Sequence, residues 1–371
     1  MARYDVIVLG GGIIGGALAE ELARRRQRVC VIERGTMGGE ASNAAAGILS
    51  SQMDLESPGP LFELCQASRR LYPAWVRKLE RLSGLSLGYH QDGILYLALT
   101  PADIRRMDQR RRWQVRLGYQ VERWSRHEAR RREPHVGPEV RAGFFFPREV
   151  QLKNATLMKA LRVSCRRAGV TVREHTEALQ VQTRGGQVTG VRTDRGIHQA
   201  PVVVNCLGSW ASLNDVLTIK PPVVPAKGQM LGFQAPKGML RHIVMSEQAY
   251  GVQHRDGYVI VGSTVEFVGF DKHLTLDGMQ RILTGFRRLI NPAVLDQFRL
   301  VDTWVGLRPC AHDRLPILGS TAIDGLYVAT GHFRHGILLA PITAKVMSDL
   351  LLTGRSSFDL SPFSLSRFAR S

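Results

Sequence analysis

The chain has 371 residues, of which 44% are hydrophobic, so it is long enough to form two domains with substantial cores. No stretch approaches roughly 18 uninterrupted apolar residues and no basic, apolar leader precedes the first strand-like run, so we expect no membrane span, no secretory signal and a cytoplasmic protein. The five cysteines are far apart and form no Cys-x-x-Cys pair, and the histidines lack metal-binding spacing. The sequence therefore predicts reduced thiols and no metal site.

The net charge is +18, and most of the 50 basic residues are arginines. Such a charge suits an anionic partner such as nucleic acid, but a genome whose codons favour arginine explains it equally well. The arginine clusters at 24–26, 110–112 and 130–132 lie in polar, helix-like contexts without interleaved aromatic residues. We therefore predict that these clusters are solvated faces and that the protein has no specific nucleic-acid partner.

The first 33 residues carry a dinucleotide-binding pattern. An apolar run leads directly into Gly10, Gly12 and Gly15, a helical pattern follows, and a second apolar run ends at Glu33. Gly10 permits a tight turn, Gly12 lets the backbone approach a pyrophosphate, and Gly15 lets the helix pack closely on the strand. The helix N-terminus would stabilise the phosphates, and Glu33 would accept hydrogen bonds from the ribose hydroxyls. The pattern predicts an adenine dinucleotide, with a glycine-rich loop that merely closes a βαβ unit as the alternative.

The rest of the chain alternates helical and extended patterns. Apolar residues with helical spacing predict helices at 61–82, near 101–117, at 155–168, near 277–289 and at 337–351. Extended segments are predicted at 89–98, 142–147, 150–153, 229–234, 242–246, 250–254 and 257–264. We expect a β-meander that begins at 169–174 and turns at 185–186, and two strands buried on both faces at 202–208 and 325–331. Pro341 is placed in the first turn of the last helix, where a missing N–H costs little.

No repeat or low-complexity linker separates two domains, so a second domain must be inserted by excursions of the chain. We predict an α/β protein with a discontinuous, Rossmann-type dinucleotide-binding domain over 1–85, 151–215 and 304–371. The inserted domain, over 86–150 and 216–303, is predicted to be α+β, mostly antiparallel, and to bind substrate.

Four later segments extend the pattern of the glycine motif: 36–48, 205–210, 306–309 and 331–341. With these segments the whole chain resembles the D-amino-acid-oxidase-like FAD-dependent oxidoreductases, and within them the glycine oxidases of the thiamine pathway. The resemblance implies non-covalent FAD as the cofactor, an amino-acid substrate, O₂ as the electron acceptor and a homo-oligomer. The glycine motif alone does not separate FAD from NAD.

The implied reaction is the oxidative deamination of glycine and related small amines such as sarcosine and small D-amino acids. A hydride passes from Cα to flavin N5, O₂ is reduced to H₂O₂, and glycine imine supplies thiazole synthesis for thiamine. Two alternatives stay open at this point. One is a D-amino-acid or sarcosine dehydrogenase with another electron acceptor, and the other is an oxidase that modifies the wobble uridine of tRNA.

Three residues are candidates for holding the substrate carboxylate. Arg308 follows a strand and precedes Pro309, and the planar guanidinium fork of arginine binds a carboxylate through two hydrogen bonds. The resemblance implies the same function for Arg308, a hydrogen bond from Tyr250 to the same carboxylate, and a position for Arg334 close to flavin and substrate. The alternative interpretations are a surface salt bridge for either arginine and a packed sheet aromatic for Tyr250.

The FAD-binding residues implied by the motifs are Gly10, Gly12, Ile13, Ile14, Gly15, Glu33, Arg34, Ala41, Ser42, Ala46, Gly47, Ile48, Ala178, His332, Phe333, Arg334, His335, Gly336, Ile337 and Leu338. Four positions depart from the family pattern or raise a question. His335 replaces asparagine, Gln248 and Val265 differ from residues near the substrate, and Cys310 lies roughly in the region where sarcosine oxidases attach flavin covalently. We expect Cys310 to be a small packed neighbour.

Overall fold

Six strands form the sheet that carries the glycine motif. The computed structural model describes residues 3–212 and 220–369, so the predicted domain boundary at 215 and 216 lies outside the described residues. The strand order is β18 (Ile317–Ser320), β19 (Leu326–Thr330), β12 (Val202–Asn205), β1 (Val6–Leu9), β2 (Val29–Ile32) and β8 (Thr171–Arg173). All neighbouring pairs are parallel except β18 with β19. All four residues of β1 are buried, as expected for a central parallel strand covered on both faces.

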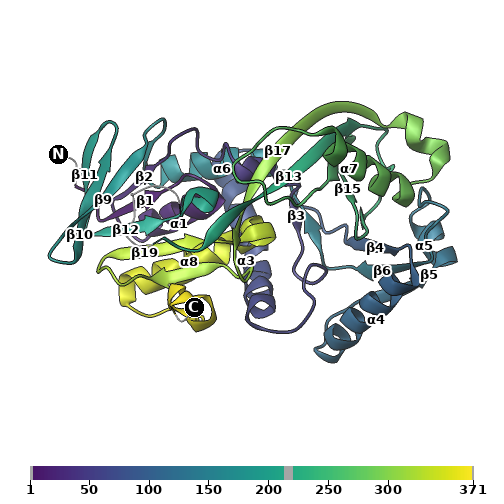
Figure 1. Cartoon of the computed structure of the whole chain (residues 1–371), viewed down its shortest axis with the longest axis horizontal. Helices are drawn as coiled ribbons and strands as arrows, with labels where there is room; N and C mark the ends of the chain where they lie inside the picture. The colour runs from purple at the N-terminus through teal and green to yellow at the C-terminus, as the bar shows by residue number, and fades with distance from the viewer. Residues whose placement is uncertain (1–2, 213–219, 370–371) are drawn as a thin grey trace.

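Helices cover one face of this sheet and a smaller sheet covers the other (Figure 1). The helices are α1 (Ile13–Arg24), α3 (Pro60–Ser83), α6 (Asn154–Arg167) and α8 (Gly336–Thr353). The small sheet is an antiparallel meander of β9 (Ala178–Arg184), β10 (Gln187–Thr193) and β11 (Gly196–Gln199). Side chains alternate along β1, so Val6 and Val8 belong to the helical core whereas Ile7 and Leu9 belong to the core under the meander.

The prediction that the segment 169–174 begins the meander is wrong. Its strand, β8, pairs in parallel with β2 at the edge of the six-stranded sheet. Helix α6 precedes β8, and a helical crossover returns the chain to the same sheet in a parallel direction. The meander starts one strand later.

The placement of Pro341 in the first turn of the last helix is also wrong. Helix α8 begins at Gly336 behind a short 3₁₀ turn, so Pro341 lies inside the helix. Proline has no N–H to donate to the carbonyl four residues earlier, that of Ile337. The hydroxyl of Tyr72 on α3 donates to this carbonyl instead. A partner from a distant helix thus compensates the lost hydrogen bond.

The second large sheet has eight strands. Its order is β17 (Arg299–Ala311), β13 (Val223–Gln234), β16 (Tyr258–Gly262), β15 (Tyr250–Gln253), β14 (Ile243–Met245), β4 (Ile94–Ala98), β6 (Ala142–Phe146) and β5 (Glu122–Ser125). It is antiparallel apart from β14 with β4, in keeping with the predicted mostly antiparallel sheet. Helices α5 (Arg126–Arg132) and α7 (Leu276–Leu289) pack on one face, and α4 (Pro101–Arg116) packs on the other.

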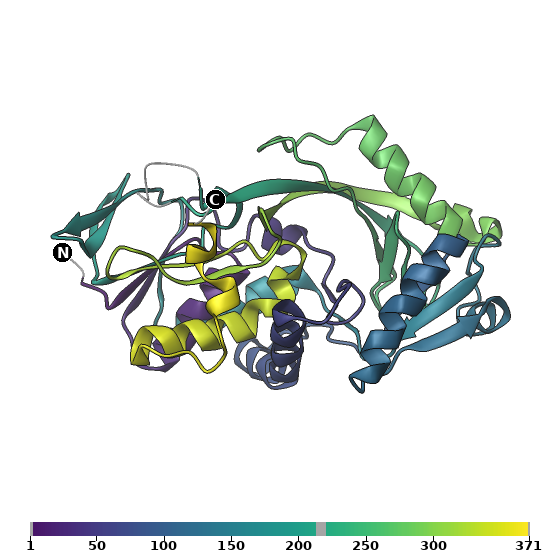
Figure 2. The ribbon, with the colours of Figure 1, turned by 60° about the horizontal axis from the view of Figure 1, so that its bottom comes forward.

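Two long strands connect the halves of the molecule. Figure 2 shows β13 and β17 running together from the eight-stranded sheet toward the six-stranded one. At its end, β17 meets the segment before α8 through a bridge between Cys310 and His332. The predicted boundary between 303 and 304 falls inside β17, and the one between 150 and 151 falls inside the short strand β7 (Val150–Gln151).

Two predictions about composition need qualification. Among the described residues, the helical segment Phe333–Thr353 is long and apolar enough to cross a membrane, but 61% of its apolar window is buried inside the protein. Of the arginines expected on solvated faces, Arg110 is buried and 7% exposed. On α4 it turns away from its exposed neighbour Arg112, because residues two apart on a helix do not share a face.

Candidate active site

One cavity runs from the carboxyl end of β1 and β2 to the face of the eight-stranded sheet that carries α4. The predicted residues that line it are Gly10, Gly12, Ile13, Ile14, Glu33, Arg34, Ala41, Ser42, Ala46, Gly47, Ile48, Ala178, Tyr250, Arg308, His332, Phe333, Arg334, Gly336 and Ile337. Gly15, His335 and Leu338 do not line it. Segments more than 200 residues apart in the chain therefore meet in one space.

At one end of the cavity the backbone of the glycine motif is tightly constrained. Gly10 has a φ of +97°, and a Cβ there would lie 2.5 Å from the carbonyl oxygen of Cys206. A Cβ on Gly15 would lie 2.0 Å from the carbonyl oxygen of Gly10, which is the close helix packing predicted for this residue. The Ser42 hydroxyl accepts a 2.9 Å hydrogen bond from the N–H of Ile13 at the start of α1. These contacts hold the N-terminus of α1 toward the cavity, where it favours anionic groups.

The carboxylate of Glu33 is fixed at the same end. Its Oε2 accepts a 2.7 Å hydrogen bond from the N–H of Gly11, and its Oε1 accepts a 2.8 Å bond from the N–H of Gly35. Nearby, the guanidinium of Arg34 lies over the ring of Trp210, 4.8 Å from its centroid. Backbone N–H groups thus hold the carboxylate of Glu33, the residue predicted to bind the ribose. Its remaining lone pairs can accept hydrogen bonds from a group bound in the cavity.

The middle of the cavity is bounded by the backbone of residues 44–48. The indole of Trp304 donates to the carbonyl oxygen of Ala44 at 2.9 Å, and the amide of Asn154 donates to that of Ala45 at 2.6 Å. Gly47 has a φ of +79°, and a Cβ there would lie 1.9 Å from the carbonyl oxygen of Leu152. Small side chains on a backbone held from two sides leave room for a flat ring to approach closely.

The residues present fit a flavin dinucleotide. The N-terminus of α8 faces the cavity at Gly336 and Ile337, where its free N–H groups would stabilise negative charge on a bound ring. Just before it, buried His332 bonds Thr343 through Nε2, whereas its Nδ1 has no partner among the residues that the structure describes. A buried polar atom without a partner is costly, so a bound group that satisfies it would be favoured.

At the far end of the cavity lies Arg308. Its Nη2 donates to the hydroxyl of Ser263 at 2.8 Å, and its Nη1 donates to the carbonyl oxygen of Thr264 at 3.1 Å. Neither Arg308 nor Arg334 has a carboxylate partner among the described residues, although both line the cavity. Burial lowers the pKa of Arg308, which means that its charge is poorly compensated. The alternative interpretation was a surface salt bridge for Arg308 or Arg334, and neither arginine forms one with a described residue.

Two glycines that the sequence analysis did not single out make room for these side chains. A Cβ on Gly228 of β13 would lie 2.3 Å from Nη1 of Arg308, on the neighbouring strand β17. A Cβ on Gly262 of β16 would lie 2.7 Å from the hydroxyl of Tyr250 on β15. Glycine inside a strand often marks a close approach, which is the signal that was available in the sequence.

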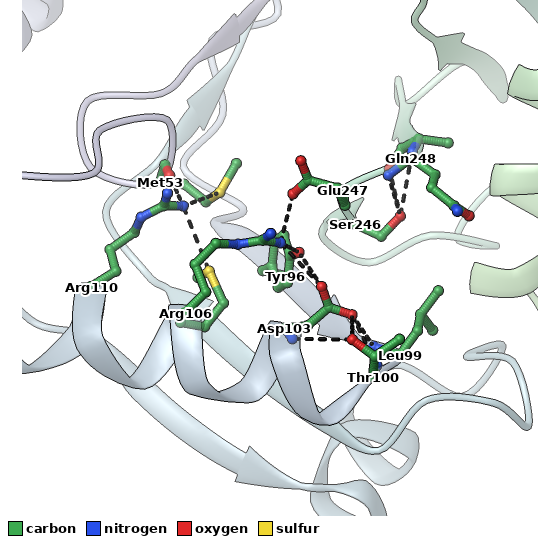
Figure 3. Close-up of polar contacts among 12 residues, drawn as sticks. Met53, Tyr96, Leu99, Thr100, Asp103, Arg106, Arg110, Ser246, Glu247 and Gln248 are labelled. Carbon is green, nitrogen blue, oxygen red and sulfur yellow. Dashed lines mark hydrogen bonds and ion pairs between the residues drawn. The ribbon is translucent and has the colours of Figure 1, made fainter.

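The loop after Gly47 was also not identified from the sequence. Glu149 is fully buried, and its carboxylate accepts hydrogen bonds from three successive backbone N–H groups, those of Ser51 at 2.8 Å, Gln52 at 2.6 Å and Met53 at 3.3 Å. The guanidinium of Arg110 donates to the carbonyl oxygen of Met53 (Figure 3). A buried carboxylate and a buried guanidinium thus hold this loop at the edge of the cavity.

Glu149 should give the protein a measurable pH dependence. Burial raises its pKa to about 7, so the native state keeps a proton that the unfolded chain releases above about pH 4.5. The stability that Glu149 contributes therefore falls as the pH rises through this window, by up to about 1.4 kcal/mol for each unit. Urea unfolding of the parent and of Glu149→Gln at about pH 5, 6 and 7 should give a difference in unfolding free energy that shrinks with pH.

The variant comparison is needed because the buried histidines act in the opposite sense. Burial lowers the pKa of His254 to about 4 and that of His332 to about 3, so their contribution to stability grows as the pH rises toward about 6.5. Both histidines are the same in the parent and in Glu149→Gln. A difference that stays constant with pH would show that Glu149 is ionised in the native state throughout.

The mouth of the cavity is bordered by an ion-pair network. Arg106 of α4 contacts the carboxylate of Glu247 at 2.6 Å, the hydroxyl of Tyr96 at 2.6 Å and the carboxylate of Asp103 at 3.1 Å (Figure 3). Glu247 lies between β14 and β15 and lines the cavity. Its charge is matched by Arg106, and the pair links α4 to the loop before Tyr250.

The thiol of Cys310 is buried in the protein and does not line this space. Cys310 is 3% exposed, its Sγ donates to the carbonyl oxygen of Ala311, and it does not line the cavity. Burial raises the pKa of the thiol, which disfavours the reactive thiolate. Gln248 does line the cavity, whereas Val265 does not.

Residues 5–350 match the family described as FAD dependent oxidoreductase. The chain belongs to this family. The resemblance, the mixed α/β fold with its Rossmann-type cofactor half and the FAD cofactor predicted from the sequence are thereby confirmed.

Relatives within the FAD-dependent oxidoreductases cover nearly the whole chain. The bifunctional protein ThiO/ThiG of Synechocystis is 39% identical over 98% of the chain, which spans about half (54%) of that longer protein. The glycine oxidase of Geobacillus kaustophilus is 34% identical over 98% of this chain and 97% of its own. The crystal structure of glycine oxidase from Geobacillus kaustophilus matches with a TM-score of 0.95 and 33% identity over 99% of both chains.

Proposed function

We propose that this protein is an FAD-dependent amine oxidase that oxidises glycine and related small amines, including sarcosine and small D-amino acids, and reduces O₂ to H₂O₂. The observation that carries the proposal is the composition of the far end of the cavity. Two guanidinium groups that have no carboxylate partner in the described part of the chain and a tyrosine hydroxyl line the space that also contains the proposed dinucleotide site. The similarity to glycine oxidases over nearly the full length supports it.

In this proposal Arg308 binds the substrate carboxylate through both nitrogen atoms of its fork, and Tyr250 donates a hydrogen bond to the same group. Burial raises the pKa of Tyr250, so the hydroxyl keeps its proton and acts as a donor. Arg334 adds positive charge at the same end. A flavin held by the cofactor-binding residues would supply the redox chemistry, as acceptor of the hydride from the substrate Cα and as electron donor to O₂.

The protein supplies orientation and charge. His332 and His335 are both buried beside the cavity, and burial lowers the pKa of each, so they are neutral at pH 7. The positive charge at the substrate end therefore comes from Arg308 and Arg334, and neither histidine contributes to it. Hydride loss from Cα requires the neutral form of the amine, and the carboxylate contacts orient Cα–H.

The predicted site residues, the two-part division of the chain, the non-covalent attachment of FAD and the finer biological context belong to the same proposal. We place the six-stranded half as the FAD-binding part and the eight-stranded half as the substrate-binding part. The similarity to ThiO/ThiG proteins supports a function in supplying an imine for thiazole formation in thiamine biosynthesis. A homo-oligomeric enzyme in the cytoplasm, without a specific nucleic-acid partner, completes the proposal.

Anaerobic reduction tests this function directly. The FAD-loaded protein is expected to lose its flavin absorbance on addition of glycine or sarcosine, to regain it within seconds when air is admitted, and to form H₂O₂. Acid precipitation should release all the flavin into solution. Bleaching that air does not reverse, but that an artificial acceptor does, would indicate a dehydrogenase. Absence of bleaching by every small amino acid tested would contradict the proposal.

A further inference from the structure

One carboxylate in the cavity has no function in the proposed reaction. Asp54 lines the same cavity as Arg308 and Tyr250. Its backbone N–H donates to the hydroxyl of Ser50, but its carboxylate has no hydrogen bond or ion pair to any residue that the structure describes. The contrast with Glu247 is direct, because the carboxylate of Glu247 is paired with Arg106.

The position of Asp54 is built by buried contacts from several elements. Three backbone N–H groups of the loop donate to Glu149, and Arg110 donates to the carbonyl oxygen of Met53. In addition, Gln66 of α3 donates to the carbonyl oxygen of Ser51 at 2.7 Å. Gln114 of α4 donates to that of Gln52 at 2.8 Å. Among residues 50–56, only Asp54 lines the cavity. A loop held this firmly fixes the one side chain that it presents.

The charge of Asp54 acts on the substrate end of the cavity. The carboxylate opposes the lowering of the pKa of Arg308 by burial, and it adds to the raising of the pKa of Tyr250. It also acts on His335 beside α8. The carboxylate of Asp54 and the guanidinium groups of Arg308 and Arg334, which form no ion pair within the described chain, therefore line one cavity, and burial strengthens the interaction between charges there.

We propose that Asp54 is a specificity-determining residue that faces the amine end of the substrate, admits amines that carry a single carboxylate and disfavours those with a second anionic group. The proposal rests on the proposed function. A zwitterion such as glycine or sarcosine presents its carboxylate to Arg308 and a positive or neutral nitrogen to Asp54. An amine with a second carboxylate on nitrogen brings that group toward Asp54, and like charges at close range cost affinity.

A matched pair of substrates isolates this effect. Sarcosine and iminodiacetate both carry an N-substituent, a methyl group in one and a carboxymethyl group in the other. We expect the ratio of kcat/KM for sarcosine to that for iminodiacetate to fall about 10- to 100-fold in Asp54→Asn. The substitution keeps the shape of the side chain, and because the carboxylate has no partner in the described chain, no internal bond is lost. Asp54→Ser serves as a second neutral variant.

Binding of inert ligands tests the same inference without turnover. Perturbation of the flavin spectrum gives Kd for propionate and for malonate, which replaces the methyl group by a second carboxylate. The ratio of Kd for malonate to Kd for propionate should fall in Asp54→Asn by a similar factor. The control is Glu56→Gln, since Glu56 lies two residues further along the same loop, is exposed and does not line the cavity. Both ratios should stay at parental values in this control.

The outcomes separate the two hypotheses. Parental ratios in Asp54→Asn, for substrates and for inert ligands alike, would overturn the function of Asp54, whether or not the parent oxidises glycine. An equal change in Glu56→Gln would also overturn it, because the effect would then come from the general surface charge. If the Kd ratio changes in Asp54→Asn as expected but the parent oxidises no small amine, the result would contradict the proposed function and leave the function of Asp54 supported.

Discussion

Replacement of Arg308 by methionine is expected to lower kcat/KM for glycine and sarcosine by about 30- to several-thousand-fold, while FAD stays bound. The substrate carboxylate would lose two charge-assisted hydrogen bonds and the charge that meets it directly, while Arg334 and Tyr250 remain at the same end of the cavity. FAD retention is expected because, among the described residues, the guanidinium bonds Ser263 and Thr264 at the proposed substrate end. Steady-state kinetics and the flavin-to-protein absorbance ratio measure the two effects separately.

The conservative variant sharpens this test. Arg308→Lys should recover only part of the activity, because a point ammonium cannot reproduce the fork that meets both carboxylate oxygens. Simple amines without a carboxylate should be poor substrates for the parent and should lose little more in Arg308→Met. Parental kcat/KM for glycine in Arg308→Met would show that the carboxylate is held elsewhere, with Arg334 as the next candidate.

The second large effect is expected at Gly228, a residue without a side chain that lines the cavity beside Arg308. In Gly228→Ala the new Cβ would lie 2.3 Å from Nη1, 2.4 Å from Nη2 and 2.5 Å from Cζ of Arg308, so the guanidinium must move. A shift of about 1 Å in a positioning group costs about 100-fold in rate. We therefore expect kcat/KM for glycine to fall by that order, with FAD content unchanged.

Gly232 on the same strand provides the matched control. A Cβ there would lie 2.2 Å from the hydroxyl of Tyr258, a similar overlap, and Gly232 does not line the cavity. Gly232→Ala should lower the unfolding temperature about as much as Gly228→Ala while glycine kinetics stay near parental. A similar loss of activity in both variants would indicate that general distortion of β13, and not displacement of Arg308, is responsible.

The sequence by itself determined the features that local rules govern. The glycine spacing, the apolar run before it and Glu33 predicted a dinucleotide site, because the turn, the close backbone approach and the helix N-terminus each require particular residues at fixed offsets. Apolar periodicity likewise located α3, α4, α6 and α7, and nearly continuous apolar runs located β12 and β19. Arg308 and Tyr250 were found as candidates by motif, and the structure places both on the cavity.

Only the tertiary structure decided features that depend on which distant segments meet. Glu149 accepts a hydrogen bond from Ser51, which lies 98 positions away in the sequence, and Tyr72 donates to the carbonyl oxygen of Ile337, which lies 265 positions away. No local period encodes such pairs, since they follow from how helices and sheets pack after each has formed. For the same reason the parallel pairing of β8 was missed and the unpaired carboxylate of Asp54 was not recognised. Asp54 has no motif around it, and it becomes informative only when the fold brings it into one cavity with Arg308.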